Sequence, residues 1–384
     1  MLPETRHALL HEVSLRRLVQ SSGPDLLTRG DPLLAWRDAR LRSGVWAWAR
    51  SLDGPVGPRV TIRDEAGIAS HGLNFVTQDP LSLATHPALH EAAREGLAHG
   101  LHASGSPCFA GSNAASGRLE TTLAELFGLE HVLLFPSGWA AAFGTLTALV
   151  QPGDHVVIDE CAHPAFMTGA LAATPHVHGH AHLDRAALAH RLGAIRAGDS
   201  RSAILVVTET LFPWESDGPD LQAMQEVCRR YGAVLLVAVG HDLGVSGPGG
   251  LGMLGAQQML GRVDLVVGSF AKTLATNGGF FATRSASAKQ LVRFLASSHA
   301  ASNGLAPLQA TIAHESLRIV VSDEGERLRA NLASAVTALR AAGAARGLRC
   351  LGASAALVPI AIGAEADARL TAALAAKRLS LIHI

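Results

Sequence analysis

The sequence has no excess of charge of either sign. Its 384 residues include 32 basic and 32 acidic side chains, so the formal net charge is zero. The lack of a basic excess argues against a nucleic-acid-binding protein, and the lack of a charged block argues against a disordered tail. Hydrophobic residues make up 48% of the chain, which is typical of a globular protein. The length suits one large domain with a smaller one beside it.

Long apolar runs are also missing. No run reaches the length that a membrane-spanning helix needs, and the amino terminus carries charges where a signal peptide would have an apolar core. Cysteine is scarce, and the spacing of the four cysteines is unlike that of a metal site. These are Cys108, Cys161, Cys228 and Cys350. Together these absences predict a cytoplasmic protein with reduced thiols and no bound metal.

The pattern of residues predicts three parts. Residues 1–60 are expected to form a helical arm, residues 61–305 a large domain and residues 306–384 an incomplete small domain. The chain ends in LSLIHI (379–384), a hexapeptide that one frame of a common transposon sequencing adapter also encodes. We therefore expect a truncated chain whose last six residues are not native, with an ordinary terminal strand as the alternative.

Strands and helices are predicted to alternate through the middle of the chain. Short apolar or β-branched runs occur at 131–135, 155–158, 203–208, 233–238 and 264–268. Two of them are apolar almost throughout, as expected for parallel strands that are covered on both faces. Stretches with helical spacing lie between the runs. The sequence therefore predicts a doubly wound α/β sheet, in which ligands bind at the carboxyl ends of the strands.

Lys272 is the first candidate functional residue. It lies in GSFAKTLATNGG (268–279), just after a predicted buried strand. Exposure to solvent is the usual state of a lysine, but here the neighbours are small and rich in hydrogen-bond donors, including Ser269 and Thr273. Burial would lower the pKa of the amine and make it nucleophilic. The surrounding chain would suit a phosphate group.

A second candidate is the segment PSGWAAAFG (136–144), which follows a predicted strand and opens a predicted helix. Its first residues, Ser137, Gly138 and Trp139, would present backbone N–H groups to an anion. An ordinary turn with a serine cap explains the same pattern equally well.

His163 and His241 each lie shortly after a predicted strand. An imidazole at the first position would stack on a flat cofactor ring, and one at the second would hydrogen-bond a ring oxygen. Structural roles are the alternative for both, because the chain has 19 histidines. The glycines at 247, 249 and 252 match the pattern GxGxxG formally, but they begin far beyond the strand and lack the acidic residue that a ribose needs.

These blocks together resemble one enzyme family. The segments FPSGWAA, VVTETLF, GHDLGVSGPGGLG and GSFAKTLATNGG, within residues 74–363, are similar in order and spacing to the α-oxoamine synthases. This family includes 8-amino-7-oxononanoate synthase and 2-amino-3-ketobutyrate CoA ligase. The resemblance implies the fold-type-I architecture of the class I/II aminotransferases, with a mostly parallel seven-stranded sheet. It also implies a pyridoxal 5′-phosphate (PLP) cofactor and a homodimer with its active site at the interface.

The same resemblance implies an activity and a set of residues. The family joins an amino acid to an acyl-CoA thioester with loss of carbon dioxide. Lys272 would bind the cofactor as an imine and move protons at the substrate α-carbon, and His163 would stack on the pyridine ring. His241 would contact the phenolic oxygen, and Glu209 matches the acidic residue near the substrate.

The cofactor's phosphate and ring would be seated by further residues. Those of the same subunit are Ser137, Gly138, Trp139 and Ser269. Ser302 and Asn303 would reach the phosphate of the neighbouring subunit.

One departure from the family pattern bears on catalysis. Ala238 stands where the family places the aspartate that pairs with the pyridine nitrogen. Alanine cannot hold that proton, so the ring would withdraw electrons less well. Asp242 is near in sequence, but nothing in the pattern predicts that it reaches the ring.

Three further interpretations remain beside an acyltransferase. The chain could be a non-catalytic family member that acts as a partner subunit, which Ala238 favours. It could also catalyse another PLP reaction, such as amino transfer, because a fold does not fix the chemistry. A nicotinamide-dependent oxidoreductase is the weakest alternative.

Overall fold

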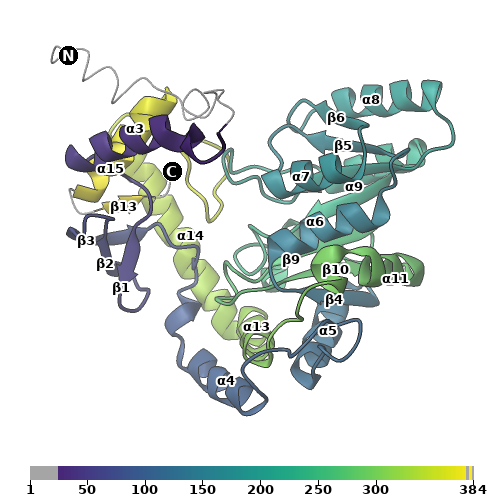
Figure 1. Ribbon diagram of the computed structural model, residues 1–384, viewed down its shortest axis with the longest axis horizontal. Coiled ribbons are helices and arrows are strands. Elements are labelled where there is room, and N and C mark those ends of the chain that lie inside the picture. The colour runs from purple at the N-terminus through teal and green to yellow at the C-terminus, as the bar shows by residue number, and fades with distance from the viewer. Residues whose placement is uncertain (1–24, 378–379, 383–384) are drawn as a thin grey trace. The chain divides into compact units, whose positions relative to one another are not determined.

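The computed structural model describes residues 25–377 and 380–382 (Figure 1). The chain forms two compact units. One unit contains Gln78–Pro359, and the other combines the described residues up to Thr77 with the described residues from Ile360 onward. Among the described residues, no helix combines the length and apolarity needed to cross a membrane.

A seven-stranded sheet forms the centre of the larger unit, with strand order β4-β10-β9-β8-β7-β5-β6. Its strands are β4 (His131–Phe135), β5 (His155–Asp159), β6 (Val177–His180), β7 (Ile204–Glu209), β8 (Val234–Ala238), β9 (Leu265–Ser269) and β10 (Gly279–Thr283). Only β10 runs antiparallel to its neighbours β4 and β9, and the other pairs are parallel. The five strands predicted from the sequence and the mostly parallel seven-stranded architecture are confirmed.

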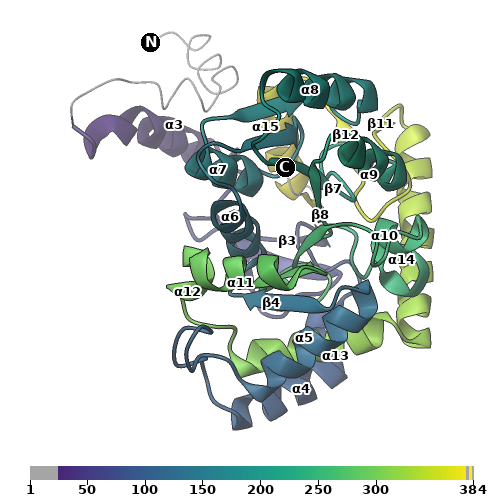
Figure 2. The ribbon, with the colours of Figure 1, turned by 90° about the vertical axis from the view of Figure 1, so that its right-hand side faces the viewer.

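Helices cover both faces of this sheet. One hydrophobic core lies between the sheet and α4 (Pro87–Ala98), α5 (Ala114–Phe127), α8 (Arg185–Gly198), α9 (Leu221–Arg230) and α13 (Pro307–Val320). A second core lies between the other face and α6 (Gly138–Leu149), α7 (Pro164–Ala173) and α11 (Ala286–Leu295). Figure 2 shows α6 and α7 on one side of β7 and β8 and α9 on the other. The central strands are buried on both faces because each face has its own core, which explains their continuous apolar sequences.

The larger unit also contains one long helix, several short helices in its connections and a two-residue strand. The elements are η2 (Leu83–Thr85), η3 (Pro248–Gly250), α10 (Gly252–Ala256), α12 (Ser297–Ala300), α14 (Asp323–Ala344) and β11 (Arg349–Cys350). Ser322 caps α14, because its hydroxyl accepts hydrogen bonds from the N–H groups of Glu324 and Gly325 at 3.2 and 3.4 Å.

The smaller unit contains a four-stranded sheet of order β1-β2-β3-β13. Its elements are η1 (Thr28–Gly30), α3 (Asp31–Arg42), β1 (Ser51–Asp53), β2 (Arg59–Arg63), β3 (Ala69–Phe75), β12 (Ile360–Ala361), α15 (Glu365–Lys377) and β13 (Ser380–Ile382). Trp36, Trp46 and Trp48 pack together with ring centroids 5.0–5.9 Å apart. The arm predicted over residues 1–60 is therefore helical at α3 but continues into the sheet, and its first 24 residues lie outside the described part.

These units differ from the predicted division at residues 60 and 305. The first boundary falls at Thr77 because β2 and β3 pair within the smaller unit. The second falls at Ile360 because α13 packs on α4 and α5 and joins their core. The strand predicted at 357–363 is limited to β12.

Candidate active site

Three strands of the central sheet end close to one another. Glu209 is the last residue of β7, Ala238 of β8 and Ser269 of β9. Glu209 pairs with Ala238 across the sheet, and Ala238 pairs with Val267 of β9. This is the edge at which parallel α/β sheets bind their ligands. The sequence segments with candidate chemistry therefore meet at one place.

Glu209 holds two histidines in place. Its Oε1 accepts a hydrogen bond from the backbone N–H of His163 at 2.6 Å, and its Oε2 lies 3.2 Å from Nδ1 of His241. The Glu209 side chain is only 3% exposed, so these two contacts compensate for the loss of water around its charge. The carboxylate thereby ties the end of β7 to the start of α7 and to the loop after β8.

His163 begins α7. Its Nδ1 accepts a hydrogen bond from the N–H of Ala165 at 3.2 Å, so the ring caps the helix and leaves Nε2 on its other side. Burial lowers the pKa of His163. The charge of Glu209 opposes this effect, whereas the nearby charges of Lys272 and His241 lower the pKa further. At neutral pH the ring is therefore a flat, uncharged imidazole, which suits stacking on another ring.

Lys272 lies three residues beyond β9. Burial lowers the pKa of its amine, and the charge of Glu209 opposes that effect without overcoming it. A Cβ atom built on Gly240 would lie 3.5 Å from Nζ of Lys272, so the amine lies directly beside the backbone after β8. More of this amine is neutral at pH 7 than in a surface lysine, which makes it a better nucleophile.

The start of α6 packs closely against the ends of β9 and β10. A Cβ on Gly138 would lie 2.5 Å from Cβ of Ser269, and a Cβ on Gly279 would lie 2.6 Å from Cα of Gly138. Ser137 caps the helix by accepting a hydrogen bond from the N–H of Ala140 at 3.1 Å, so the serine-cap interpretation is confirmed. The helix start also lies where an anion would be stabilised, and that role remains a prediction.

Three other predicted site residues lie farther out. Trp139 is 48% exposed and stacks on Phe143 with ring centroids 5.0 Å apart, so it covers the outside of α6. Ser302 is partly buried and Asn303 is exposed in the loop between α12 and α13. The resemblance places these last two against a neighbouring subunit, so their role also remains a prediction.

Ala238 presents a methyl group where the family pattern has a carboxylate. The residue is 8% exposed, so little water can take over the missing contact. Asp242 cannot replace it, because its Oδ1 accepts a hydrogen bond from the Thr210 hydroxyl at 2.5 Å and its Oδ2 accepts one from the Met253 N–H at 2.7 Å. Burial raises the pKa of Asp242 to about 6.

The residues at this edge fit PLP in most respects. Lys272 offers a largely buried amine for an aldehyde, and His163 offers an uncharged ring. Gly138 leaves open the space beside Ser269 that a Cβ would fill, and the backbone at Gly240 lies beside Lys272. The start of α6 and Ser269 suit a phosphate. The single mismatch is at position 238, where the proton of a pyridine ring would find no acceptor on the side chain.

Two features of the site were not predicted from the sequence. Thr210 fixes Asp242, and the backbone at Gly240 lies beside the amine of Lys272. The glycines of the weak GxGxxG match have a structural explanation, because Gly247, Gly249 and Gly252 all have positive φ (71°, 60° and 61°). A Cβ on Gly252 would also collide with the Asp242 carboxylate. They shape the loop around Asp242.

Comparison with protein families gives a match over most of the chain. The family model for aminotransferases of class I and II matches residues 70–383. An 8-amino-7-oxononanoate synthase from Citrifermentans bemidjiense is 31% identical over 331 residues, which cover 86% of this chain and 82% of that protein. The enzyme of the same name from Methylococcus capsulatus is 33% identical over 349 residues, covering 88% and 84%.

Solved structures give a similar result. A serine palmitoyltransferase variant from S. paucimobilis with a bound adduct of PLP and myriocin has a TM-score of 0.85 and 25% identity, covering 94% of this chain and 92% of that one. A serine palmitoyltransferase from Sphingomonas wittichii has a TM-score of 0.84 and 25% identity, covering 94% and 88%.

Proposed function

This chain belongs to the class I and II aminotransferase family and is a PLP-dependent acyltransferase of the α-oxoamine synthase type, and we propose that its product is 8-amino-7-oxononanoate. Enzymes of this type condense an amino acid with an acyl-CoA thioester, which releases carbon dioxide and the free thiol. The identities of 31–34% with synthases of that product support this choice.

The product's structure indicates the two substrates. In a decarboxylating condensation, the amine-bearing carbon comes from the amino acid and the ketone carbon comes from the acyl group. In 8-amino-7-oxononanoate the amine-bearing carbon also carries a methyl group, as in alanine. The other seven carbons form an acyl chain with a terminal carboxylate. The proposed substrates are therefore alanine and the CoA thioester of a seven-carbon dicarboxylic acid.

A second substrate pair is serine with a long-chain acyl-CoA. The TM-scores of 0.84–0.85 with serine palmitoyltransferases favour it. Their sequence identity of 25% is lower than the 31% of an oxononanoate synthase. The residues that line a substrate pocket depend on sequence identity more directly than on agreement of the backbone. We therefore place this pair second.

The observation that carries the proposal is the environment of Lys272. Its amine is buried and has a lowered pKa, and Glu209 is the charged group that acts on it. PLP, when bound, draws electrons away from the amino acid's α-carbon. In this role Lys272 would hold the cofactor and take up the α-proton as a general base, since an uncharged amine has a free electron pair.

The neighbouring residues would orient the reactants. The imidazole of His163 would stack on the cofactor ring, and Glu209 would fix that imidazole through its backbone N–H. His241 would meet the phenolic oxygen while its Nδ1 remains against Glu209. Ser269 and the first turn of α6 would hold the phosphate. Ala238 would leave the ring nitrogen without its usual partner, so we expect slow turnover.

The active unit is proposed to be a homodimer. Ser302 and Asn303 would contribute to the phosphate site of the neighbouring subunit, as the family resemblance implies. The site would then be incomplete in a monomer.

The test measures thiol release from acyl-CoA by the PLP-loaded protein. Alanine and serine are each supplied with the seven-carbon dicarboxylic acyl-CoA and with palmitoyl-CoA, and products are identified by mass spectrometry. The proposal predicts the fastest release with alanine and the dicarboxylic thioester, and none from Lys272→Ala. A preference for serine and palmitoyl-CoA would support the second pair. If no pair releases thiol although PLP is bound, both proposed substrate pairs are wrong.

A further inference from the structure

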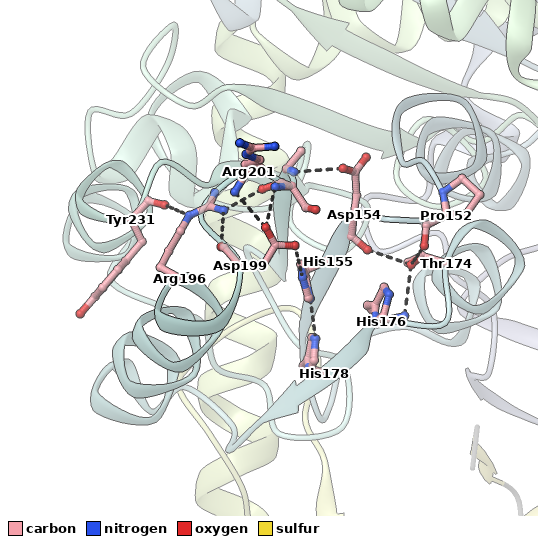
Figure 3. A network of polar contacts seen from close by, with 12 residues as sticks. Pro152, Asp154, His155, Thr174, His176, His178, Arg196, Asp199, Arg201 and Tyr231 are labelled. Atoms are coloured by element: carbon pink, nitrogen blue, oxygen red, sulfur yellow. Dashed lines mark hydrogen bonds and ion pairs between the residues drawn. The ribbon is translucent and has the colours of Figure 1, made fainter.

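Histidines gather at the opposite end of the sheet from Lys272. His155 is the first residue of β5. His176 directly precedes β6, the edge strand next to it, and His178 is the second residue of that strand. Figure 3 shows the rings of these three residues close together. The carboxyl end of β5 is Asp159, so the whole strand separates this cluster from the active-site edge.

The three imidazoles lie within reach of one another. Nδ1 of His155 is 3.0 Å from Nε2 of His178, and these two rings stack with centroids 5.3 Å apart. The ring of His176 lies 5.0 Å from that of His155. On the other side of His155, Nε2 is 3.3 Å from Oδ2 of Asp199. Two imidazole nitrogens therefore already lie at a ligand spacing, with a third imidazole ring and one carboxylate beside them.

The protein backbone holds the carboxylate firmly. Oδ1 of Asp199 accepts hydrogen bonds from the N–H groups of Arg201 and Ser202 at 2.8 and 3.0 Å, which leaves Oδ2 facing His155 (Figure 3). Arg196 secures the same turn by donating to the carbonyls of Ser202 and Tyr231, both at 2.7 Å.

The cluster is open to solvent. A shallow groove is lined by His155, His176, His178, Arg191 and Asp199, so an ion can enter without unfolding the sheet. An imidazole nitrogen that carries no proton has a lone pair available for a metal. The positive charge of Arg191 opposes a cation, and the carboxylate of Asp199 offsets it.

We propose that His155, His176 and His178 bind one divalent transition-metal ion of the zinc type, with Asp199 as the neighbouring carboxylate. Two nitrogens at about 2.0–2.1 Å from a tetrahedral Zn²⁺ are about 3.3 Å apart. The 3.0 Å between His155 and His178 is close to that spacing. The ion would replace the proton that these two rings share, and rotation of the exposed His176 ring would supply the third nitrogen. Imidazole ligands suit Zn²⁺, Ni²⁺ and Cu²⁺ and disfavour Mg²⁺ and Ca²⁺.

Zinc binding to the full-length, PLP-loaded protein tests the proposal. The protein is first treated with a chelator and exchanged into metal-free buffer, and Zn²⁺ is then titrated against a chromophoric zinc indicator. We expect one equivalent with a dissociation constant of about 10 μM or tighter. His176→Gln and His178→Gln should each weaken binding by about tenfold or more, because glutamine lacks the imidazole nitrogen.

His190→Gln is the matched control. His190 is an exposed histidine of α8 in the same region, and it lines a different groove. This variant should bind zinc as the parent does. Circular dichroism and the visible spectrum of bound PLP show that each variant is folded, and His176→Gln, at an exposed position, keeps the test valid if His178→Gln does not fold.

Substitution of Co²⁺ gives a second readout, because tetrahedral cobalt has visible absorption bands that depend on its ligands. These bands should be present in the parent and in His190→Gln and absent in the double variant of His176 and His178. The proposal is overturned if the parent binds no zinc at about 1 mM, or if the double variant binds it as tightly as the parent.

Discussion

At the scale of single residues, position 238 sets the chemistry of this site. Glu209 and Ala238 are paired at the ends of adjacent strands, and the charge of Glu209 is already engaged with His163 and His241. A pyridine ring bound beside them would have no acidic side chain at its nitrogen. The electron withdrawal on which the reaction depends would therefore be weakened, although the cofactor could still be attached through Lys272.

Ala238→Asp should restore that contact. A hydrogen bond to a charged group contributes about 1.5–3 kcal/mol, so the dissociation constant of PLP should fall by about ten- to a hundred-fold. Exchange of the α-proton of alanine with D₂O should also become faster. Equilibrium dialysis and NMR measure the two effects.

Ala238→Asn is the matched control, since asparagine has the same shape without the charge. The new aspartate would lie beside Glu209, so the variant without PLP should be less stable than the parent, and PLP should reverse this loss. If the aspartate variant binds PLP and exchanges protons as the parent does, our explanation of position 238 is wrong.

The candidate residues could be found from the sequence because most of them directly follow a strand. Lys272, Glu209 and His163 occupy such positions, and parallel strands bring their carboxyl ends together. The contacts between them could not be predicted. The double contact of Glu209 and the burial of Asp242 depend on the register of β7 and β8, which no local pattern specifies.

At the scale of elements, the start of α6 depends on glycine at position 138. A side chain there would meet Ser269, whose Cβ would be 2.5 Å away. We expect Gly138→Ala to push α6 away from β9 and to lower stability by about 1–3 kcal/mol, as overpacking does. PLP binding should also weaken, because the helix start would no longer lie beside Ser269.

Gly153→Ala provides the control for this change. A Cβ on Gly153 would meet nothing within 4 Å, and its φ is not in the left-handed region. Thermal melting and PLP titration of both variants give the comparison. Equal effects at positions 138 and 153 would contradict the close packing that we describe.

His182 joins two further elements. Its Nδ1 is 2.7 Å from Oδ1 of Asp159 at the end of β5, and its Nε2 is 3.0 Å from Oδ1 of Asp217 in the loop after β7. Burial alone would lower the pKa of His182, but the two carboxylates outweigh it and the net shift is upward. The protonated ring therefore stabilises the fold.

His182→Gln should accordingly be most damaging at low pH. A histidine with a raised pKa contributes its full stability below the ordinary value of about 6.5 and loses it as the pH rises through the raised value. The ring is partly exposed, so we expect a loss of about 1–2 kcal/mol at pH 6 and a smaller loss at pH 9. Melting temperatures at pH 6 and pH 9, with His190→Gln as control, measure this loss of stability. A loss that does not change with pH would show that His182 acts through packing alone.

The elements themselves were predictable where the apolar pattern was strong. The five predicted strands are all present, because each is buried between two helical layers. The strands β6 and β10 were not picked out from the pattern. β6 (VHGH) is a polar edge strand, and β10 (GFFAT) begins at the second glycine of a pair. Pairing with a neighbouring strand, rather than local preference, specifies both of them.

At the scale of the whole molecule, the division of the chain follows contacts between distant segments. β13 pairs in parallel with β3, although about 300 residues separate them in the sequence. Such a pairing cannot be read from local composition. The predicted boundaries at 60 and 305 therefore marked changes in residue pattern, whereas the structural boundaries lie at Thr77 and Ile360.

A shared active site predicts complementation between inactive variants. Lys272→Ala lacks the amine, and Ser302→Asp should repel the phosphate of the neighbouring subunit. Each variant alone should be nearly inactive. After the two are mixed and allowed to exchange subunits, about a quarter of the sites should be intact, because half of the dimers are mixed and each of these has one site without either change.

Thiol release by the mixture measures this recovery, and light scattering checks that dimers form. A mixture of Lys272→Ala with the unmodified chain corrects for dilution. If the mixture of variants stays as inactive as its components, Ser302 and Lys272 do not serve the same site from different subunits.

The attachment point of the cofactor shows whether Lys272 is the reactive amine. The chain has three lysines, at positions 272, 289 and 377. The protein is loaded with PLP, reduced with borohydride and digested, and the pyridoxyl group is located by mass spectrometry. We predict that the group lies on Lys272 and that Lys272→Ala carries none. A pyridoxyl group on Lys289 or Lys377, or no pyridoxyl group at saturating PLP, would show that Lys272 does not hold the cofactor.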